Sequence, residues 1–333
     1  MSTVRPEDEY RHPEPEDNEE AEGLWGDTLW VSVVDRDANI FGINHFHLTT
    51  KGFGRFETLY VIDGVKQLYG NKVPLEPEAD RGPWSDGRLS YEVVDPLKEV
   101  RISFDGPSYG FDLRFRGRFP AFDYEDCIKG NPLSRFNAYG GHNEQGMHCT
   151  GEFEIRGGRC KGERRNLDSW SHRDHSWSSR FHDEPQWEWK QQHVPGHFWP
   201  SIQLPDRHIN AFGVMDPARI GFPEDRLPVG GFVATADGAE PILEAKAEVL
   251  LEEDCRTAMA FRYRLTLPGE EVIHVRTGRK YGMVKLWDRA ENDLENRLDC
   301  YEPFFDFEVE ETGDRGYGVA EYSIMPPWPR WLV

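Results

Sequence analysis

Acidic, basic and aromatic side chains are concentrated near the midpoint of the 333-residue chain, in residues 168–180. This segment reads Asp-Ser-Trp-Ser-His-Arg-Asp-His-Ser-Trp-Ser-Ser-Arg, so carboxyl, imidazole, guanidinium and indole groups share one short stretch. Aromatic rings that enclose a carboxyl group disfavour its charged form and raise its pKa toward the range that suits a general acid. Asp174 is therefore the candidate acid, with His172, His175 and Trp177 as candidate catalytic neighbours.

Strand alternation would divide this segment between two faces. His172 and Asp174 would point to one face, whereas His175 and Trp177 would point to the other. The expected partner of Asp174 is therefore His172 or a histidine of residues 142–148, unless a bulge at residues 176–179 reverses this assignment.

The same charges also allow a purely structural interpretation. Arg173 or Arg180 could pair with Asp174 in a buried ion-pair network that has no part in catalysis. Structural networks of this kind perturb pKa values as active sites do. The sequence leaves both interpretations open.

Further polar side chains could converge on an apolar cavity, which is how small-molecule sites are usually built. The histidines of His-Phe-His at residues 45–47 share a strand face, and residues 140–148 carry several more polar groups. Alternatively, the His47 side chain could be exposed to solvent on a hairpin. The candidate substrate-binding residues are His45, His47, His142, Glu144, His148, Trp170 and Arg180.

A histidine-rich stretch raises the question of a metal. Five histidines suited to zinc or iron lie between residues 172 and 197, namely His172, His175, His182, His193 and His197. Their spacing matches no familiar metal-binding signature, and several sets of two histidines and one carboxylate can be drawn. We predict no metal site, and a metal-dependent protein remains an alternative.

Composition excludes several classes of partner. A net charge of −21 repels phosphate backbones and anionic membranes. The five cysteines include no CxxC pair, which indicates reduced thiols, and no apolar run is long enough to span a membrane or direct export. No glycine-rich loop joins a strand to a helix, so a phosphate cradle is not expected. We expect a cytoplasmic protein.

The elements that must position these residues are strands. Short β-branched and aromatic runs separated by turn signals recur through both halves, and residues 111–116 alternate strictly between apolar and charged. Helical periodicity is confined to residues 286–298, and residues 205–227 are typical of a long connection. The sequence predicts an all-β chain of two antiparallel domains, with an acidic disordered tail at 1–22 and domains at 23–167 and 168–333.

The order of these motifs resembles a known family. His-Asn-Glu-Gln at 142–145, followed by Arg-Asp-His-Ser-Trp at 173–177 and by Arg180, is similar to the hydroxyneurosporene synthase (carotenoid 1,2-hydratase) family. The resemblance implies two consecutive lipocalin-like antiparallel β-barrels and no cofactor. It further implies that Asp174 protonates an alkene while Trp177 stabilises the carbocation. Ser178 departs from the family pattern, which has glycine there.

These observations predict a cofactor-independent lyase of the hydratase or dehydratase type. Its substrate would be an apolar aromatic or isoprenoid small molecule, and decarboxylation or isomerisation would use the same groups. The alternative is a non-enzymatic lipocalin-type carrier in which the charged motif is a structural clasp. Unpaired edge strands would be compatible with a homodimer.

Overall fold

The computed structural model describes most of the chain as β-strand. The described residues are 4–16, 25–50, 52–75, 80–124, 140–179, 196–215, 229–254, 256–287 and 299–324. They divide into two compact units, here called unit 1 (Met1–Asp123 with Asn137–Asp183) and unit 2 (Tyr124–Phe136 with Glu184–Val333). No helix within the described ranges is long and apolar enough to cross a membrane.

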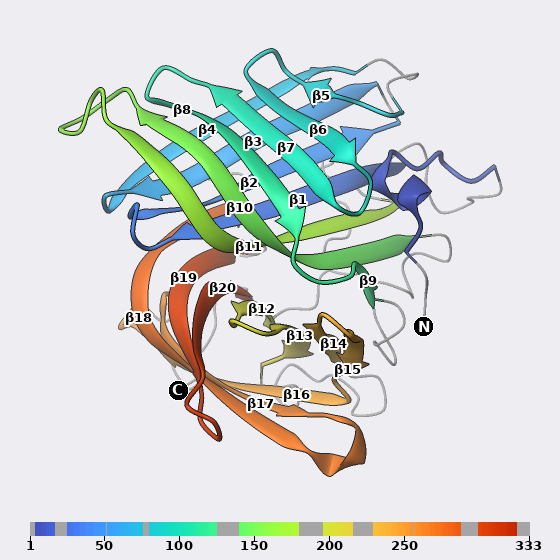
Figure 1. The fold of residues 1–333 in the computed structure, drawn as a ribbon, viewed down its shortest axis with the longest axis vertical. Helices are drawn as coiled ribbons and strands as arrows, with labels where there is room; N and C mark the ends of the chain where they lie inside the picture. Colours follow the sequence, from blue (N-terminus) through green and yellow to red (C-terminus); the bar gives the residue numbers. More distant parts are fainter. Residues whose placement is uncertain are drawn as a thin grey trace. The chain divides into compact units, whose positions relative to one another are not determined.

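Unit 1 is built on one antiparallel sheet of 11 strands, in the order β4-β3-β2-β1-β11-β10-β8-β7-β6-β5, with β9 paired to β10. Blue β1 therefore lies beside green β11, although the two are far apart in the chain (Figure 1). The strands are β1 (Trp25–Asp35), β2 (Ile40–Thr49), β3 (Phe53–Ile62), β4 (Val65–Pro74), β5 (Trp84–Ser85), β6 (Leu89–Asp95), β7 (Glu99–Asp105), β8 (Tyr109–Gly117), β9 (Phe122–Asp123), β10 (Gly141–Ile155) and β11 (Arg164–Ser179).

The unit 1 sheet curls back on itself around an aromatic core. The Tyr109 hydroxyl of β8 donates a hydrogen bond of 3.2 Å to the Thr58 carbonyl of β3, although these strands are far apart in the sheet order. Phe46 of β2 packs edge-on against both Phe56 and Tyr91, with ring centroids 5.8 and 5.3 Å away. Large rings thus fill the concave side, as the alternating strand pattern requires.

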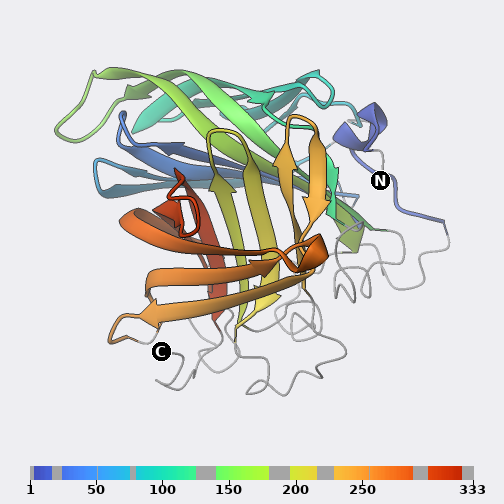
Figure 2. The same cartoon turned by 60° about the horizontal axis from the view of Figure 1, so that its bottom comes forward.

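Unit 2 repeats this plan in a 9-stranded antiparallel sheet of order β15-β14-β13-β12-β20-β19-β18-β17-β16. Its strands, coloured yellow to red, form a strongly bent sheet (Figure 2). Tyr322 of β20 reaches across it, accepting a hydrogen bond from the Ala258 amide and donating one to the Arg256 carbonyl. The strands are β12 (His197–Gln203), β13 (His208–Val214), β14 (Gly230–Thr235), β15 (Gly238–Pro241), β16 (Glu244–Leu251), β17 (Ala258–Thr266), β18 (Val272–Trp287), β19 (Asp299–Val309) and β20 (Arg315–Ile324).

The all-β class and the two consecutive β units predicted from the sequence are confirmed. The expected boundary at residue 168 falls inside β11, and all of that strand belongs to unit 1. Its pairing with both β1 and β10 explains why the chain cannot change units there.

Other expectations differ from the structure in detail. Residues 4–16, expected in a disordered tail, contain the 3-10 helix η1 (Pro6–Glu9), and Glu9 is buried. The expected connection at 205–227 contains β13. The helix expected at 286–298 begins with two residues of β18, and its remainder lies outside the described residues.

Truncating the aromatic core of unit 1 should destabilise that unit strongly. Phe46→Ala removes a fully buried ring and leaves a cavity, so we expect a loss of about 3–5 kcal/mol in the free energy of unfolding. Leu68→Ala is the matched control, because that side chain on β4 is 64% exposed, and it should change stability by less than about 0.5 kcal/mol. Urea unfolding followed by tryptophan fluorescence measures both, and equal effects would contradict the assigned core.

Candidate functional site

One face of the unit 1 sheet carries a row of polar and aromatic side chains that runs across five strands. Residues that lie directly opposite each other in antiparallel strands point to the same face. The paired positions in this row are Glu144 on β10, Asp174 on β11, Trp30 on β1, His45 on β2 and Glu57 on β3. We call this side of the sheet the Asp174 face. His142, His172 and His47 lie on it in the neighbouring rows.

Four ionisable side chains on this face form a connected cluster. The His142 Nε2–H donates to Asp174 Oδ2 at 2.5 Å and lies 3.1 Å from Glu144 Oε1. The other oxygen of Glu144 contacts His172 Nε2. Each histidine therefore touches a carboxylate, and Glu144 bridges the two imidazoles. We call these four residues the His142 cluster.

The electrostatics of the cluster hold a proton on His142. Burial alone would lower the pKa of this imidazole, but the adjacent charges and hydrogen bonds of Asp174 and Glu144 outweigh burial and raise the pKa to about 10. His142 is therefore an imidazolium at neutral pH. The Asp174 side chain keeps 15% of its exposure, against 5% for His142 and 0% for Glu144. Asp174 is thus the member of this trio most open to an incoming molecule.

Further side chains on this face surround the cluster. Trp30 is opposite Asp174 and makes a T-shaped ring contact with His172, with centroids 5.5 Å apart. His45 Nδ1 lies 3.1 Å from Glu57 Oε2, and His47 is buried, so the exposed alternative for His47 is wrong. The Asp174 face is therefore lined with imidazoles beyond the cluster itself.

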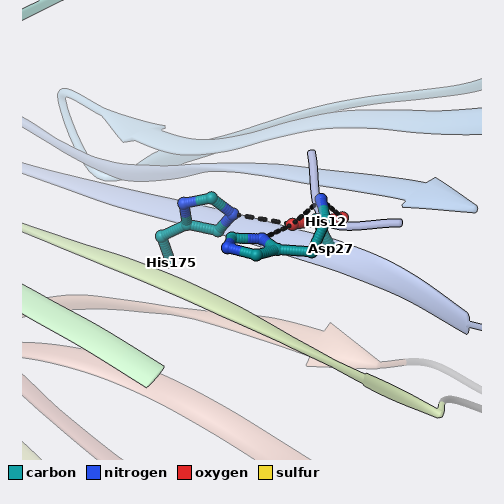
Figure 3. Close-up of side chains that lie close together, drawn as sticks. All are labelled: His12, Asp27 and His175. Atoms are coloured by element: carbon teal, nitrogen blue, oxygen red, sulfur yellow. Dashed lines mark hydrogen bonds and ion pairs between the residues drawn. The ribbon is translucent and has the colours of Figure 1, made fainter. Parts of the chain in front are cut away.

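His175 and Trp177 do not join Asp174, because alternation along β11 sends them to the opposite face. There His175 Nε2 lies 3.0 Å from Asp27 Oδ1, and His12 Nδ1 lies 2.7 Å from the same oxygen (Figure 3). Trp177 stacks on the His12 ring with centroids 3.6 Å apart. Burial would raise the pKa of Asp27, but the hydrogen bonds from both histidines lower it overall. Trp177 therefore lies on the opposite face of the sheet from Asp174, whereas the family resemblance implies that the two act on the same substrate.

Arg173 pairs with Glu9 rather than with Asp174, and Arg180, the other cation expected near Asp174, lies outside the described residues. Arg173 is buried on the same face as His175, where its guanidinium contacts Glu9 at 2.5 Å and donates to Gln145 Oε1 at 2.9 and 2.7 Å. Paired buried charges of this kind hold elements together. Arg173 thus joins η1 to β10 and β11, while Asp174 has His142 as its partner.

Two predicted binding residues, His148 and Trp170, have contacts outside the cluster, and a third is not described. His148 Nε2 contacts Asp168 Oδ1 at 2.6 Å, and both side chains are exposed. Trp170 packs under the Arg118 guanidinium, 4.3 Å from its ring centroid. Arg180 lies outside the described residues.

Sequence reasoning missed Trp30, Asp27 and His12. Trp30 and Asp27 meet β11 through strand pairing across more than a hundred residues, and a strand pattern does not name its partner. His12 lies in a segment whose acidic composition is typical of disorder. The only usable signal was the alternation in residues 25–35, which places Asp27 among apolar positions.

Comparison with known proteins supports the fold. The family described as "Domain of unknown function (DUF7064)" matches residues 5–326. Kievitone hydratase from Nectria haematococca is similar at 17% identity and a TM-score of 0.58, covering 91% of this chain and 90% of that one. CghA is similar at 10% identity and a TM-score of 0.62, covering 92% and 90%, and a structure of CghA with Sch210972 has a TM-score of 0.60 at 10% identity, covering 90% and 88%. No curated protein matches the sequence. These structures confirm the two-unit β fold that the family resemblance implies.

The raised pKa of His142 makes the stability of unit 1 depend on pH. The stabilisation that protonated His142 contributes is fully present below the pKa of this histidine in the unfolded chain, near 6.5. It is lost as the pH rises through about 10. Between pH 6 and pH 10.5 we expect wild type to lose a few kcal/mol of its free energy of unfolding relative to His142→Gln. A loss on this order follows from the difference between the folded and unfolded pKa values of His142. Urea unfolding across that range measures the difference.

The control for this titration is His148→Gln, which removes an exposed imidazole paired with Asp168 on the same two strands. Exposed pairs contribute about 0–1 kcal/mol, so its pH profile should follow that of wild type. Should His142→Gln fail to fold, the wild-type ring can be titrated by NMR, and a midpoint near 6.5 would contradict the assignment.

Proposed function

Since the DUF7064 match covers most of the chain, the protein belongs to that family, and we propose that it is a lyase of the hydratase or dehydratase type. The observation that carries this proposal is the imidazolium of His142 held between two carboxylates, one of which, Asp174, is partly exposed. General acid catalysis requires a proton donor within hydrogen-bond reach of the substrate, and the partly exposed Asp174 can be reached in this way. That one protein of similar fold is a hydratase agrees with this reaction class.

The proposed hydration proceeds in two balanced steps. The proton on His142 Nε2 passes to Asp174, which delivers it to one alkene carbon and leaves a carbocation on the other. The indole of Trp30, which lies opposite Asp174, stabilises that cation through its ring face. Water then adds to the cation, and the proton it releases returns to the Asp174–His142 pair. The reverse sequence is dehydration, and neither direction needs a cofactor.

Glu144 and His172 support this exchange by positioning His142. Glu144 is fully buried and touches both imidazoles, so it fixes the position of the His142 ring as the proton moves. The indole of Trp30 beside Asp174 supports the expectation of a largely apolar substrate, aromatic or isoprenoid. Decarboxylation or isomerisation of such a substrate would use the same proton.

The proposal predicts that Asp174→Asn abolishes turnover without unfolding the chain. An amide cannot relay the proton, so the rate should fall about 100-fold or more, in line with the usual contribution of general acids. Purified protein is incubated in H₂¹⁸O with a panel of aromatic and isoprenoid alkenes, and mass spectrometry detects ¹⁸O in the alcohol product. Isomerisation would incorporate no ¹⁸O, and decarboxylation would release CO₂.

Asp168→Asn is the matched control, because Asp168 lies on the same face of β11 and also pairs with a histidine, but is exposed. It should keep wild-type turnover. Full activity in Asp174→Asn would refute the acid role. A wild-type protein that binds panel compounds but converts none of them would instead support the carrier alternative.

A further inference from the structure

A second cluster of ligand-type side chains lies on the face opposite Asp174. His12 comes from the N-terminal segment, Asp27 from β1 and His175 from β11, and their side chains point toward one another (Figure 3). All three belong to unit 1. None of them takes part in the proton transfer described above, so this cluster needs a separate explanation.

The ligand atoms of this cluster already lie at near-coordinating separations. His12 Nδ1 and His175 Nε2 are 2.7 and 3.0 Å from Asp27 Oδ1, and the three atoms lie within 4.8 Å of one another. In a tetrahedral zinc site, bonds of about 2.0–2.2 Å separate neighbouring ligand atoms by roughly 3.3 Å. The two separations from Asp27 Oδ1 would therefore need to lengthen by only a few tenths of an ångström to admit an ion.

The surrounding contacts fix the orientation of His12 and Asp27. The His12 ring is stacked on Trp177 with an interplanar angle of 8°, and the His12 amide donates to both carboxylate oxygens of Asp27. Trp25 Nε1–H donates to the His12 carbonyl at 2.8 Å. Outer contacts that orient ligands in this way are typical of metal sites.

The donor set selects the class of ion. Two imidazoles and one carboxylate suit zinc, ferrous iron, cobalt and nickel, whereas magnesium and calcium prefer sites made of oxygen atoms alone. The side chains of Asp27 and His175 are 2% and 6% exposed, and that of His12 is 18% exposed, so an ion would enter from the His12 side.

We propose that His12, Asp27 and His175 bind one divalent transition-metal ion of the zinc class, and that this ion fastens the N-terminal segment to the unit 1 sheet. The segment otherwise depends on the Glu9–Arg173 ion pair and a few hydrogen bonds. The competing explanation is that hydrogen bonds alone fasten the segment. Both imidazoles would then donate to Asp27, and added metal would neither bind at this cluster nor change the stability of the segment.

The test is binding of Zn²⁺ and Co²⁺ to the chelator-treated full-length protein. Isothermal titration calorimetry should show one Zn²⁺ site in wild type that weakens at least tenfold in both His12→Ala and Asp27→Asn. Co²⁺ should give visible absorption in wild type that both variants lose. Zn²⁺ should also slow hydrogen exchange in residues 4–16 of wild type but not of Asp27→Asn, a readout that is independent of catalytic activity.

The matched control is His274→Ala, which removes a histidine that contacts Glu311 at 2.6 Å in unit 2 and belongs to no three-ligand group among the described residues. It should bind Zn²⁺ as wild type does. Circular dichroism checks that the variants fold, and Asp27→Asn conserves side-chain volume in case His12→Ala loosens the segment. Zn²⁺ binding that is equal in wild type and both variants, or absent from wild type at micromolar concentrations, would overturn the proposal.

Discussion

The antiparallel pairing of β1 with β11 is the interaction on which the rest of unit 1 depends. It joins residues 25–31 to residues 173–179 and places both strands in the middle of the sheet. Because side chains alternate along a strand, a register shift of one residue would exchange the two faces of β11. The pairing therefore decides that Asp174 meets Trp30 while His175 lies beside Leu29.

Ionisable side chains are buried on both faces of β11, and on each face they contact groups of opposite type. On one side Asp174 and Glu144 surround His142, and on the other Arg173 meets Glu9 while Asp27 meets two histidines. Leaving one such charge unpaired would cost several kcal/mol, so the N-terminal segment that supplies Glu9 and His12 is part of the folded unit. The acidic composition of that segment is typical of disorder, so composition alone does not predict this role.

The fold is shared more widely than the chemistry. Proteins that are 10% and 17% identical to this chain keep the two-unit architecture, because alternating strands around an aromatic core tolerate many sequences. A reaction depends on a few side chains at set distances, such as His142 and Asp174 at 2.5 Å. The shared fold therefore does not identify the reaction, and the proposed proton donor rests on the His142 cluster.

The sequence by itself determined the all-β class, the two β units and the division of residues 172–177 between two faces, because strand periodicity is a local property. It also narrowed the partner of Asp174 to His172 or residues 142–148, and the structure selects His142. Only the tertiary structure decided that Trp30, rather than Trp177, lies opposite Asp174, and that His12 reaches Asp27 and His175. These contacts depend on the register between strands distant in the chain and on the path of the N-terminal segment, which no local pattern encodes.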